Sequence, residues 1–170
     1  MKRSTMTRRA LMGSAGLAAL APLTAGAQRH IQSDDYDYEV QRTEDEWRAM
    51  LTEDEYTILR RGSTELPNTS PLAEETRDGM YHCKGCDLPV FSANWKEPID
   101  KGWVFFKHAE PNAILTGIDG AVREYGMAEG STTLMEIHCR RCGSHLGHYL
   151  FVAMQNVHCI NGTALNFIAA

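Results

Sequence analysis

The chain is short of positive charge and lacks a long uninterrupted apolar run, and both features exclude classes of function. Its 170 residues include 17 Lys and Arg against 22 Asp and Glu. Binding to nucleic acid or to an anionic membrane surface needs clustered basic side chains, so neither partner is expected. The apolar stretch at residues 10–23 is interrupted by glycine, serine and proline and falls short of the roughly 20 apolar residues of a spanning helix.

The first 27 residues have the three parts of an export signal. Lys2, Arg3 and the pair Arg8-Arg9 precede the apolar stretch, and Ala25-Gly26-Ala27 after it is a small-x-small cleavage sequence. The arginine pair is similar to that of a twin-arginine signal. We therefore predict a cleaved signal peptide and an exported, periplasmic protein; a retained membrane anchor is the alternative.

Composition divides the chain into a signal peptide over residues 1–27, a flexible leader over 28–41 and one folded domain over 42–170. Residues 28–38 are polar and acidic without an apolar period, which is typical of a mobile leader. Cleavage would leave 13 basic against 22 acidic residues, a formal charge of −9. The 143 residues that remain are enough to bury one core.

Two short helices are predicted at the start of the domain. Thr43 with Glu46, and Thr52 with Glu55, have the spacing of capping boxes, and Gly62 would end the second helix at Arg61. The apolar faces expected from helical spacing are Trp47, Met50 and Leu51 in the first helix and Tyr56 and Leu59 in the second.

From residue 79 onward, short β-rich segments alternate with turn residues. The ranges predicted as strands are 79–83, 89–92, 102–107, 132–139, 147–152, 157–161 and 164–168. We therefore predict an α+β fold, mainly β, in which short N-terminal helices wrap an antiparallel β-sheet or small barrel.

Cysteine is scarce, and its count of five is odd. Four cysteines form two Cys-x-x-Cys pairs, Cys83 with Cys86 and Cys139 with Cys142. Two turns of this kind would give a tetrahedral four-cysteine site for one structural zinc per chain. Gly85 and Gly143 would allow the backbone angles, and Lys84, Arg140 and Arg141 would partly offset the thiolate charge. Two disulfides, redox-active pairs and an iron centre are the alternatives, and the charge of −9 disfavours a nucleic-acid-binding zinc ribbon.

The fifth cysteine, Cys159, is accompanied by residues that suit thiol chemistry. The thiolate is the reactive form of cysteine, and a neighbouring imidazolium lowers the thiol pKa. His145 and His148 could supply that imidazolium, or give a proton to a leaving oxygen. Trp103 could form one wall of an apolar pocket. The residues alone therefore predict a Cys/His site with an aromatic pocket.

Together these motifs resemble the B-type methionine sulfoxide reductases, which reduce the R-epimer of methionine sulfoxide. The resemblance covers residues 42–167. It is carried by Arg42-Thr43-Glu44-Asp45-Glu46-Trp47, Thr69-Ser70-Pro71-Leu72, both Cys-x-x-Cys pairs, Gly102-Trp103, His145-Leu146-Gly147-His148 and Cys159-Ile160-Asn161.

The resemblance implies a role for each of these residues. Cys159 would attack the sulfoxide sulfur and become a sulfenic acid, while His145 or His148 protonates the oxygen. Trp103 would pack on the ε-methyl group, and Asn161 would orient substrate or water. The two Cys-x-x-Cys pairs would form the family's zinc site. The implied activity is reduction of R-methionine sulfoxide, free or in proteins.

The chain departs from the family pattern near the proposed nucleophile. Lys101 stands where many members carry a resolving cysteine, so an external thiol or a thioredoxin-like reductant would recycle Cys159. The usual Trp-Pro-Ser-Phe is here Trp103-Val104-Phe105-Phe106, which predicts that Phe105 and Phe106 line a bulkier substrate pocket. Val157 replaces an arginine. The alternative function is a catalytically weak zinc-binding β-module that binds oxidised peptides or a protein partner.

Overall fold

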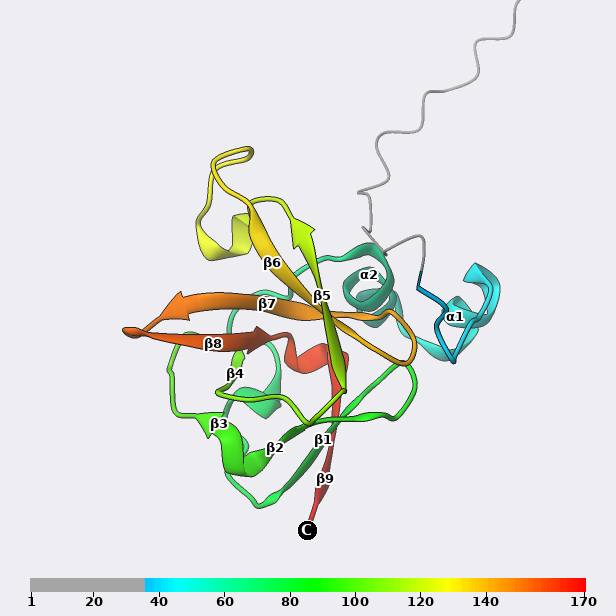
Figure 1. Cartoon of the computed structure of the whole chain (residues 1–170), viewed down its shortest axis with the longest axis horizontal. Coiled ribbons are helices and arrows are strands. Elements are labelled where there is room, and N and C mark those ends of the chain that lie inside the picture. The colour runs from blue at the N-terminus through cyan, green and yellow to red at the C-terminus, as the bar shows by residue number, and fades with distance from the viewer. Residues whose placement is uncertain (1–35) are drawn as a thin grey trace, which may run out of the picture.

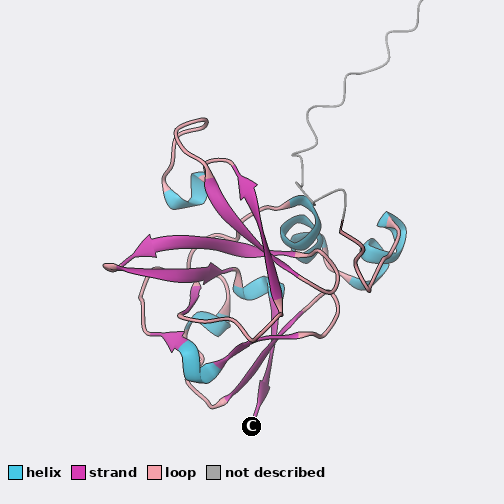
Figure 2. Ribbon diagram, viewed as in Figure 1, coloured by secondary structure: helices cyan, strands magenta, loops and turns pink. Residues whose placement is uncertain are grey.

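The computed structural model describes residues 36–170, so the predicted signal peptide and most of the predicted leader lie outside the described residues. Two short helices precede two antiparallel sheets, as predicted (Figure 2). The described end of the predicted leader contacts the domain: Val40 N–H donates to the Arg141 carbonyl at 2.9 Å. No helix in the described part of the chain has the length and apolar character to span a membrane.

The helices begin and end where their caps predict. Helix α1 (Glu44–Met50) has Thr43 as N-cap and helix α2 (Glu53–Arg61) has Thr52, each in a complete capping box. Gly62 ends α2 in the left-handed conformation. The predicted apolar face of α1 is wrong at Met50, which is 45% exposed. Trp47 alone of the α1 residues is buried, because the chain turns away after Met50 to start α2.

The smaller sheet contains β1 (Gly79–Cys83), β2 (Pro89–Ser92) and β9 (Leu165–Ala169) in the order β2-β1-β9. Both strand pairs are antiparallel. The last strand of the chain therefore pairs with the first strand of the domain, and the C-terminus lies at the foot of this sheet (Figure 1).

The larger sheet has six strands in the order β3-β4-β8-β7-β6-β5, with every pair antiparallel. Its members are β3 (Lys96–Glu97), β4 (Val104–Phe106), β5 (Ile114–Asp119), β6 (Leu134–Cys139), β7 (His145–Val152) and β8 (Gln155–Ile160). Short 3-10 helices η1 (Pro71–Ala73), η2 (Ala93–Trp95), η3 (Arg123–Tyr125) and η4 (Gly162–Ala164) lie in the connections. Strands β7 and β8 are joined by a two-residue turn, Ala153-Met154, in which both residues have positive φ.

Two strands were not predicted. Strand β3 has only two residues, too few for a sequence pattern. Strand β5 contains Gly117 and no fully buried side chain, so it lacks the apolar alternation that marks a strand. It lies at the edge of the sheet and pairs with β6 along its whole length.

One apolar core joins the helices to both sheets. The Phe91 and Phe106 rings stack at 4.5 Å between centroids, and Tyr81 meets Phe106 edge-on at 4.9 Å. A smaller cluster on the other face of β4 and β8 contains Phe105, Val157 and Cys159. The proposed nucleophile therefore lies outside the main core, in an apolar patch of its own.

Candidate functional site

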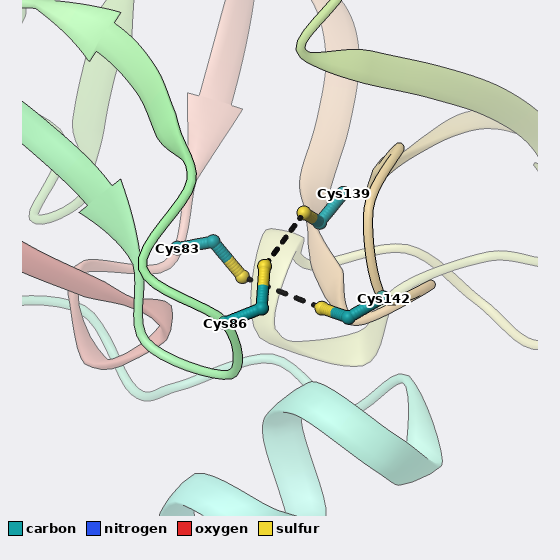
Figure 3. Close-up of side chains that lie close together, drawn as sticks. All are labelled: Cys83, Cys86, Cys139 and Cys142. Carbon is teal, nitrogen blue, oxygen red and sulfur yellow. Dashed lines mark hydrogen bonds between the residues drawn. The ribbon is translucent and has the colours of Figure 1, made fainter. Parts of the chain in front are cut away.

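The two Cys-x-x-Cys pairs converge on one point (Figure 3). Cys83 ends β1 and Cys86 lies in the turn to β2, while Cys139 ends β6 and Cys142 lies in the turn to β7. Their four Sγ atoms lie within 4.8 Å of one another. The Sγ–Sγ distance is 3.5 Å from Cys86 to Cys139 and 3.7 Å from Cys83 to Cys142. Both distances join one hairpin to the other.

These distances fit a shared metal ion and not a disulfide. A disulfide holds its sulfurs about 2.05 Å apart, whereas four sulfurs at about 2.3 Å from a tetrahedral zinc lie about 3.8 Å from one another. All five cysteines belong to the described residues 36–170, and none of them forms a disulfide. The four-cysteine cluster could therefore bind a metal ion such as zinc.

The two turns differ in how they use glycine. Gly143 has a φ of 68°, as its predicted role requires. In the first turn the positive φ belongs to Asp87 and not to Gly85. A Cβ on Gly85 would lie 2.6 Å from Ser144 Oγ and 3.4 Å from Cys142 Sγ. Gly85 therefore allows the two hairpins to approach each other closely.

The predicted counter-charges bind carboxylates. Lys84 Nζ lies 2.9 Å from Glu55 Oε1, and Arg140 Nη1 lies 2.7 Å from Glu39 Oε1. Arg141 Nη1 donates to the Cys86 carbonyl at 3.3 Å. These contacts tie the hairpins to α2, to the segment before α1 and to each other, and the predicted offset of thiolate charge by the three cations stays a prediction.

Arg60 of α2 is a further cation beside the four-cysteine cluster. Its Nη1 donates to the Cys142 carbonyl at 3.1 Å and to Ser144 Oγ at 3.3 Å. Burial lowers the pKa of this guanidinium, and negative charge on Cys142 and Cys83 opposes that shift. The guanidinium also lies over the Trp47 ring at 4.5 Å. Helix α2 thus supplies positive charge at the four-cysteine cluster.

A second group of side chains forms a row across the larger sheet. Phe105 pairs with Cys159, Cys159 with His148, and His148 with Glu136. Residues directly opposite one another in antiparallel strands point to the same face. The row therefore brings the predicted nucleophile and one predicted histidine together on the face opposite the main core.

Each of the two histidines is held by a carboxylate. His148 Nε2 lies 2.9 Å from Asp119 Oδ2, and His145 Nδ1 lies 2.7 Å from Glu136 Oε1. Both histidine side chains are fully buried, and their ring centroids are 5.1 Å apart. The carboxylates fix the orientation of the rings, as is usual for histidines that move protons.

The protonation states of His148 and Asp119 follow from burial and hydrogen bonding. Burial lowers the pKa of His148, and the hydrogen bond with Asp119 only partly opposes this shift. Burial raises the pKa of Asp119, but hydrogen bonds from His148 and from Gly120 N–H outweigh it and hold the pKa below its ordinary value. A neutral His148 that donates from Nε2 to an ionised Asp119 has Nδ1 available as an acceptor.

Tyr125 of η3 lies at that acceptor. Its Oη is 3.3 Å from His148 Nδ1, and its ring meets the His148 ring edge-on at 5.7 Å between centroids. It also meets the Trp103 ring edge-on at 5.1 Å. Tyr125 packs against the cluster that contains Phe105 and Cys159. It therefore contacts the site from the side that faces away from the sheet.

Cys159 is 2% exposed. Burial raises the pKa of its thiol to about 12, although a hydrogen bond from Tyr125 opposes the shift. At neutral pH the thiol is therefore protonated in this arrangement.

The predicted pocket residues separate onto two faces of β4. Trp103 and Phe105 belong to the Cys159 cluster. Phe106 belongs to the main core and stacks on Phe91. It does not line the Cys159 site, because neighbouring residues of a strand point to opposite faces.

Asn161 holds backbone groups near the site. Its Oδ1 accepts from Glu65 N–H at 3.0 Å, and its Nδ2 donates to the Leu146 carbonyl at 3.2 Å. The Glu65 carboxylate in turn accepts from the N–H groups of Gly162 and Thr163. Asn161 therefore positions the strands around Cys159, and its predicted contact with substrate stays a prediction.

Gly147 allows β7 to approach β8 at the site. A Cβ there would lie 2.1 Å from the Cys159 carbonyl oxygen and 2.9 Å from Ile160 Cα. Only a residue without a side chain fits against the Cys159–Ile160 backbone at this distance.

A cleft of about 560 Å³ opens beside the histidine carboxylates. Its lining includes Asp119, Glu136, Thr64 and residues 121–124 but not Cys159. The cleft therefore reaches the partners of both histidines and stops short of the thiol.

Sequence reasoning missed Asp119, Glu136 and Tyr125. Glu136 is the one carboxylate within the predicted strand 132–139 and is buried, and a buried carboxylate usually has a partner, so a signal for it existed. Asp119 ends an unpredicted strand, and Tyr125 lies in the connection after it. Neither of these two has a local pattern that predicts its contact with His148.

Comparison with known proteins shows the family of the chain. The model of the SelR domain matches residues 51–169. A peptide methionine sulfoxide reductase MsrB of Methylibium petroleiphilum is 34% identical over 139 residues, covering 79% of this chain and 95% of that protein. Peptide methionine sulfoxide reductase B3 of Arabidopsis thaliana is 32% identical, covering 77% of this chain and 72% of that protein. Both relatives are named peptide methionine sulfoxide reductases. The chain therefore belongs to the SelR-domain family.

Proposed function

We propose that the protein reduces the R-epimer of methionine sulfoxide, free or within proteins, to methionine. The observation that carries the proposal is the cross-strand pairing of Cys159 with His148, beside Trp103 and apart from the four-cysteine cluster. A thiol, a proton carrier and an aromatic wall are the three groups that the reaction needs. The names of the relatives support the same activity.

In the proposed reaction, His148 takes the proton that leaves the Cys159 thiol, and the thiolate attacks the sulfoxide sulfur. The sulfur–oxygen bond of the substrate breaks, the oxygen passes to Cys159, and methionine leaves. Cys159 is oxidised by two electrons to a sulfenic acid while the substrate sulfur is reduced by two. His148 or His145 returns the proton to the oxygen. Trp103 packs on the substrate methyl group, and Asn161 orients substrate or water.

Recycling of Cys159 requires a reductant from outside the chain. The other four cysteines lie in the cluster, and Lys101 at the position of the usual resolving cysteine is exposed. Two thiols of an external reductant, such as a thioredoxin-like protein, would convert the sulfenic acid to the thiol and release water and a disulfide.

The four-cysteine cluster would hold one structural zinc per chain through Cys83, Cys86, Cys139 and Cys142. The sulfur spacing fits this ion, and Arg60 offsets part of the thiolate charge. Zinc would supply stability to the two hairpins, and the sulfur chemistry belongs to Cys159. The signal-like sequence at residues 1–27 supports an exported, periplasmic location for the mature protein.

A second candidate is a catalytically weak zinc-binding β-module that binds oxidised peptides or a protein partner. The burial of Cys159 and its raised pKa favour this candidate, because a buried protonated thiol is a poor nucleophile.

An assay with separated epimers tests the proposal. Zinc-loaded wild type and Cys159→Ser are incubated with R- or S-methionine sulfoxide and dithiothreitol, and methionine is measured by chromatography. Reduction of the R-epimer alone, lost in Cys159→Ser, supports the enzyme. A folded, zinc-loaded wild type that reduces neither epimer eliminates it and favours the binding module. A single turnover without reductant, followed by dimedone trapping, should label Cys159.

A further inference from the structure

Tyr125 occupies the space through which a substrate would reach Cys159. The thiol lies on the face of the sheet that points away from the main core, yet it is 2% exposed. Tyr125 packs over the apolar cluster that contains Cys159, together with the side chains of Trp103 and Ile99. The Tyr125 side chain also hydrogen-bonds the Cys159 thiol, so it is one of the groups that cover the sulfur directly.

The contacts of Tyr125 match those that a bound sulfoxide would make. Its hydroxyl oxygen lies 3.3 Å from His148 Nδ1, the place where a sulfoxide oxygen could receive a proton after Nδ1 has taken one from Cys159. Its ring lies against Trp103, at 5.1 Å between centroids and nearly perpendicular, where the substrate methyl group would pack. One tyrosine therefore provides an oxygen for the histidine and an apolar body for the tryptophan.

We propose that Tyr125 is an internal occupant of the sulfoxide site, and that the segment 120–133 withdraws it before substrate binds. The inference rests on the proposed function for the identity of the substrate. The covering of Cys159 by Tyr125 stands independently of that function, because it concerns only access to the thiol.

The segment 120–133 has few buried contacts apart from those of Val122 and Tyr125. It joins β5 to β6 and projects beyond the end of the sheet (Figure 1). A Cβ placed on Gly120, Gly126 or Gly130 would meet no atom within 4 Å. Its ion pair, between Arg123 and Glu129, is formed by exposed side chains, and such pairs contribute little stability. Few buried contacts and an exposed backbone are typical of segments that open locally.

Withdrawal of Tyr125 would join the site to an existing cleft. The cleft of about 560 Å³ is lined by Asp119, Thr64 and residues 121–124, which immediately precede Tyr125 in the chain. It reaches the carboxylate that holds His148. The lining includes Glu124, the residue before Tyr125, so withdrawal of Tyr125 would extend this cleft toward Cys159.

Alkylation of Cys159 measures this covering without any assumption about catalysis. Full-length zinc-loaded wild type, Tyr125→Ala and Tyr149→Ala are treated with iodoacetamide, and the modified Cys159 peptide is followed by mass spectrometry. Tyr149 is a matched control because it lies in β7 beside His148 and points to the opposite face of the sheet, against His158. The reaction rate is proportional to the fraction of open molecules, so removing a cover that is closed nine-tenths of the time should raise it about tenfold.

The same variants separate access from chemistry in the sulfoxide assay. Because only open molecules bind substrate, the apparent affinity is the intrinsic affinity multiplied by the open fraction, so Tyr125→Ala should lower KM for R-methionine sulfoxide more than it changes kcat. Tyr149→Ala should leave both the alkylation rate and KM at the wild-type values. If Tyr125→Ala does not fold, Tyr125→Leu removes the ring and the hydroxyl while it retains apolar contacts, and the same expectations apply.

An alkylation rate in folded Tyr125→Ala equal to that of wild type would overturn the proposal, as would an equal increase in Tyr149→Ala. Faster alkylation in a protein that reduces neither epimer would support the cover and remove the proposed function. Unchanged alkylation in a protein that reduces the R-epimer would remove the cover alone.

Discussion

Cys159 and His148 are directly opposite each other in neighbouring antiparallel strands, so their side chains leave the sheet on the same face. Neither residue depends on a loop for its position relative to the other. The pair is extended on one side by Phe105 and on the other by Glu136.

Asp119→Asn should lower R-sulfoxide reduction by about 100-fold, because proton transfer by a positioned histidine is worth at least that much. The ionised carboxylate favours the charged form of His148, so its loss should lower the His148 pKa further. The acidic limb of the kcat/KM profile should then move to lower pH. Asp100→Asn, at an exposed carboxylate, is the control, and an unmoved limb in Asp119→Asn would contradict the assignment.

Gly147→Ala should destabilise the fold by about 1–3 kcal/mol, because an added methyl group forces β7 and β8 apart. The new Cβ would lie 2.1 Å from the Cys159 carbonyl oxygen, so activity should fall along with stability. Urea unfolding of the zinc-loaded protein measures the change. Gly120→Ala is the control, since a Cβ there meets nothing within 4 Å; equal losses in both variants would show that the close approach is not the cause.

Phe105→Ala should mainly change substrate binding, whereas Phe106→Ala should mainly lower stability. Phe106 stacks in the main core, so its loss should cost about 3–5 kcal/mol of unfolding free energy. Phe105 lies beside Cys159, so its loss should change KM for the sulfoxide more than Phe106→Ala does at temperatures where both variants are folded. Thermal unfolding and steady-state kinetics give the two readouts. A larger KM change in Phe106→Ala would contradict the placement.

The alkylation rate of Cys159 should keep rising at pH values above those at which an ordinary thiol is fully ionised. Burial raises its pKa to about 12, so below that value the thiolate fraction grows about tenfold for each pH unit. Because the thiolate is the form that reacts, the alkylation rate should keep rising from pH 7 to pH 10. Glutathione, measured alongside, should level off above its own pKa. A plateau for Cys159 near pH 8.5 would show that burial does not control the thiol.

Removal of metal should unfold the domain. Binding of a structural zinc contributes on the order of 10 kcal/mol to small zinc modules, and the cluster joins two hairpins from different sheets. Cys139→Ser, or a chelator added to wild type, should therefore lower Tm sharply. Cys159→Ser should keep about one zinc per chain and a Tm close to that of wild type. Metal analysis that finds no zinc in folded wild type would reject the zinc assignment.

Local signals explain which parts of the fold could be predicted. The caps at Thr43 and Thr52 act through residues three positions away, so both helix starts follow from the sequence. The cysteine pairs have a spacing that indicates a shared site, and the structure brings them together. Met50 is exposed although its helical spacing indicates a buried face. The spacing of apolar residues shows which side chains share a face, but the position of the neighbouring helix decides which of them are buried.

The candidate site could be predicted only in part, because its contacts depend on strand register. Cys159, His145 and His148 have recognisable motifs, but Asp119 and Glu136 reach the histidines through the pairing of β5, β6 and β7. Tyr125 reaches the site through a connection with no repeating pattern. The separation of Phe105 from Phe106 likewise follows from the pairing of β4 with β8.

The two-residue turn between β7 and β8 makes the chemistry sensitive to chain length. Ala153 and Met154 are the only residues of this turn, since Val152 already pairs with Gln155. Side-chain direction alternates with a period of two, so a single-residue insertion that shifted the register would leave Cys159 and His148 on opposite faces. The strands could remain paired, and the fold could persist without the site. Insertions and deletions among related sequences should therefore occur in the 120–133 segment, while the β7–β8 hairpin keeps a constant number of residues.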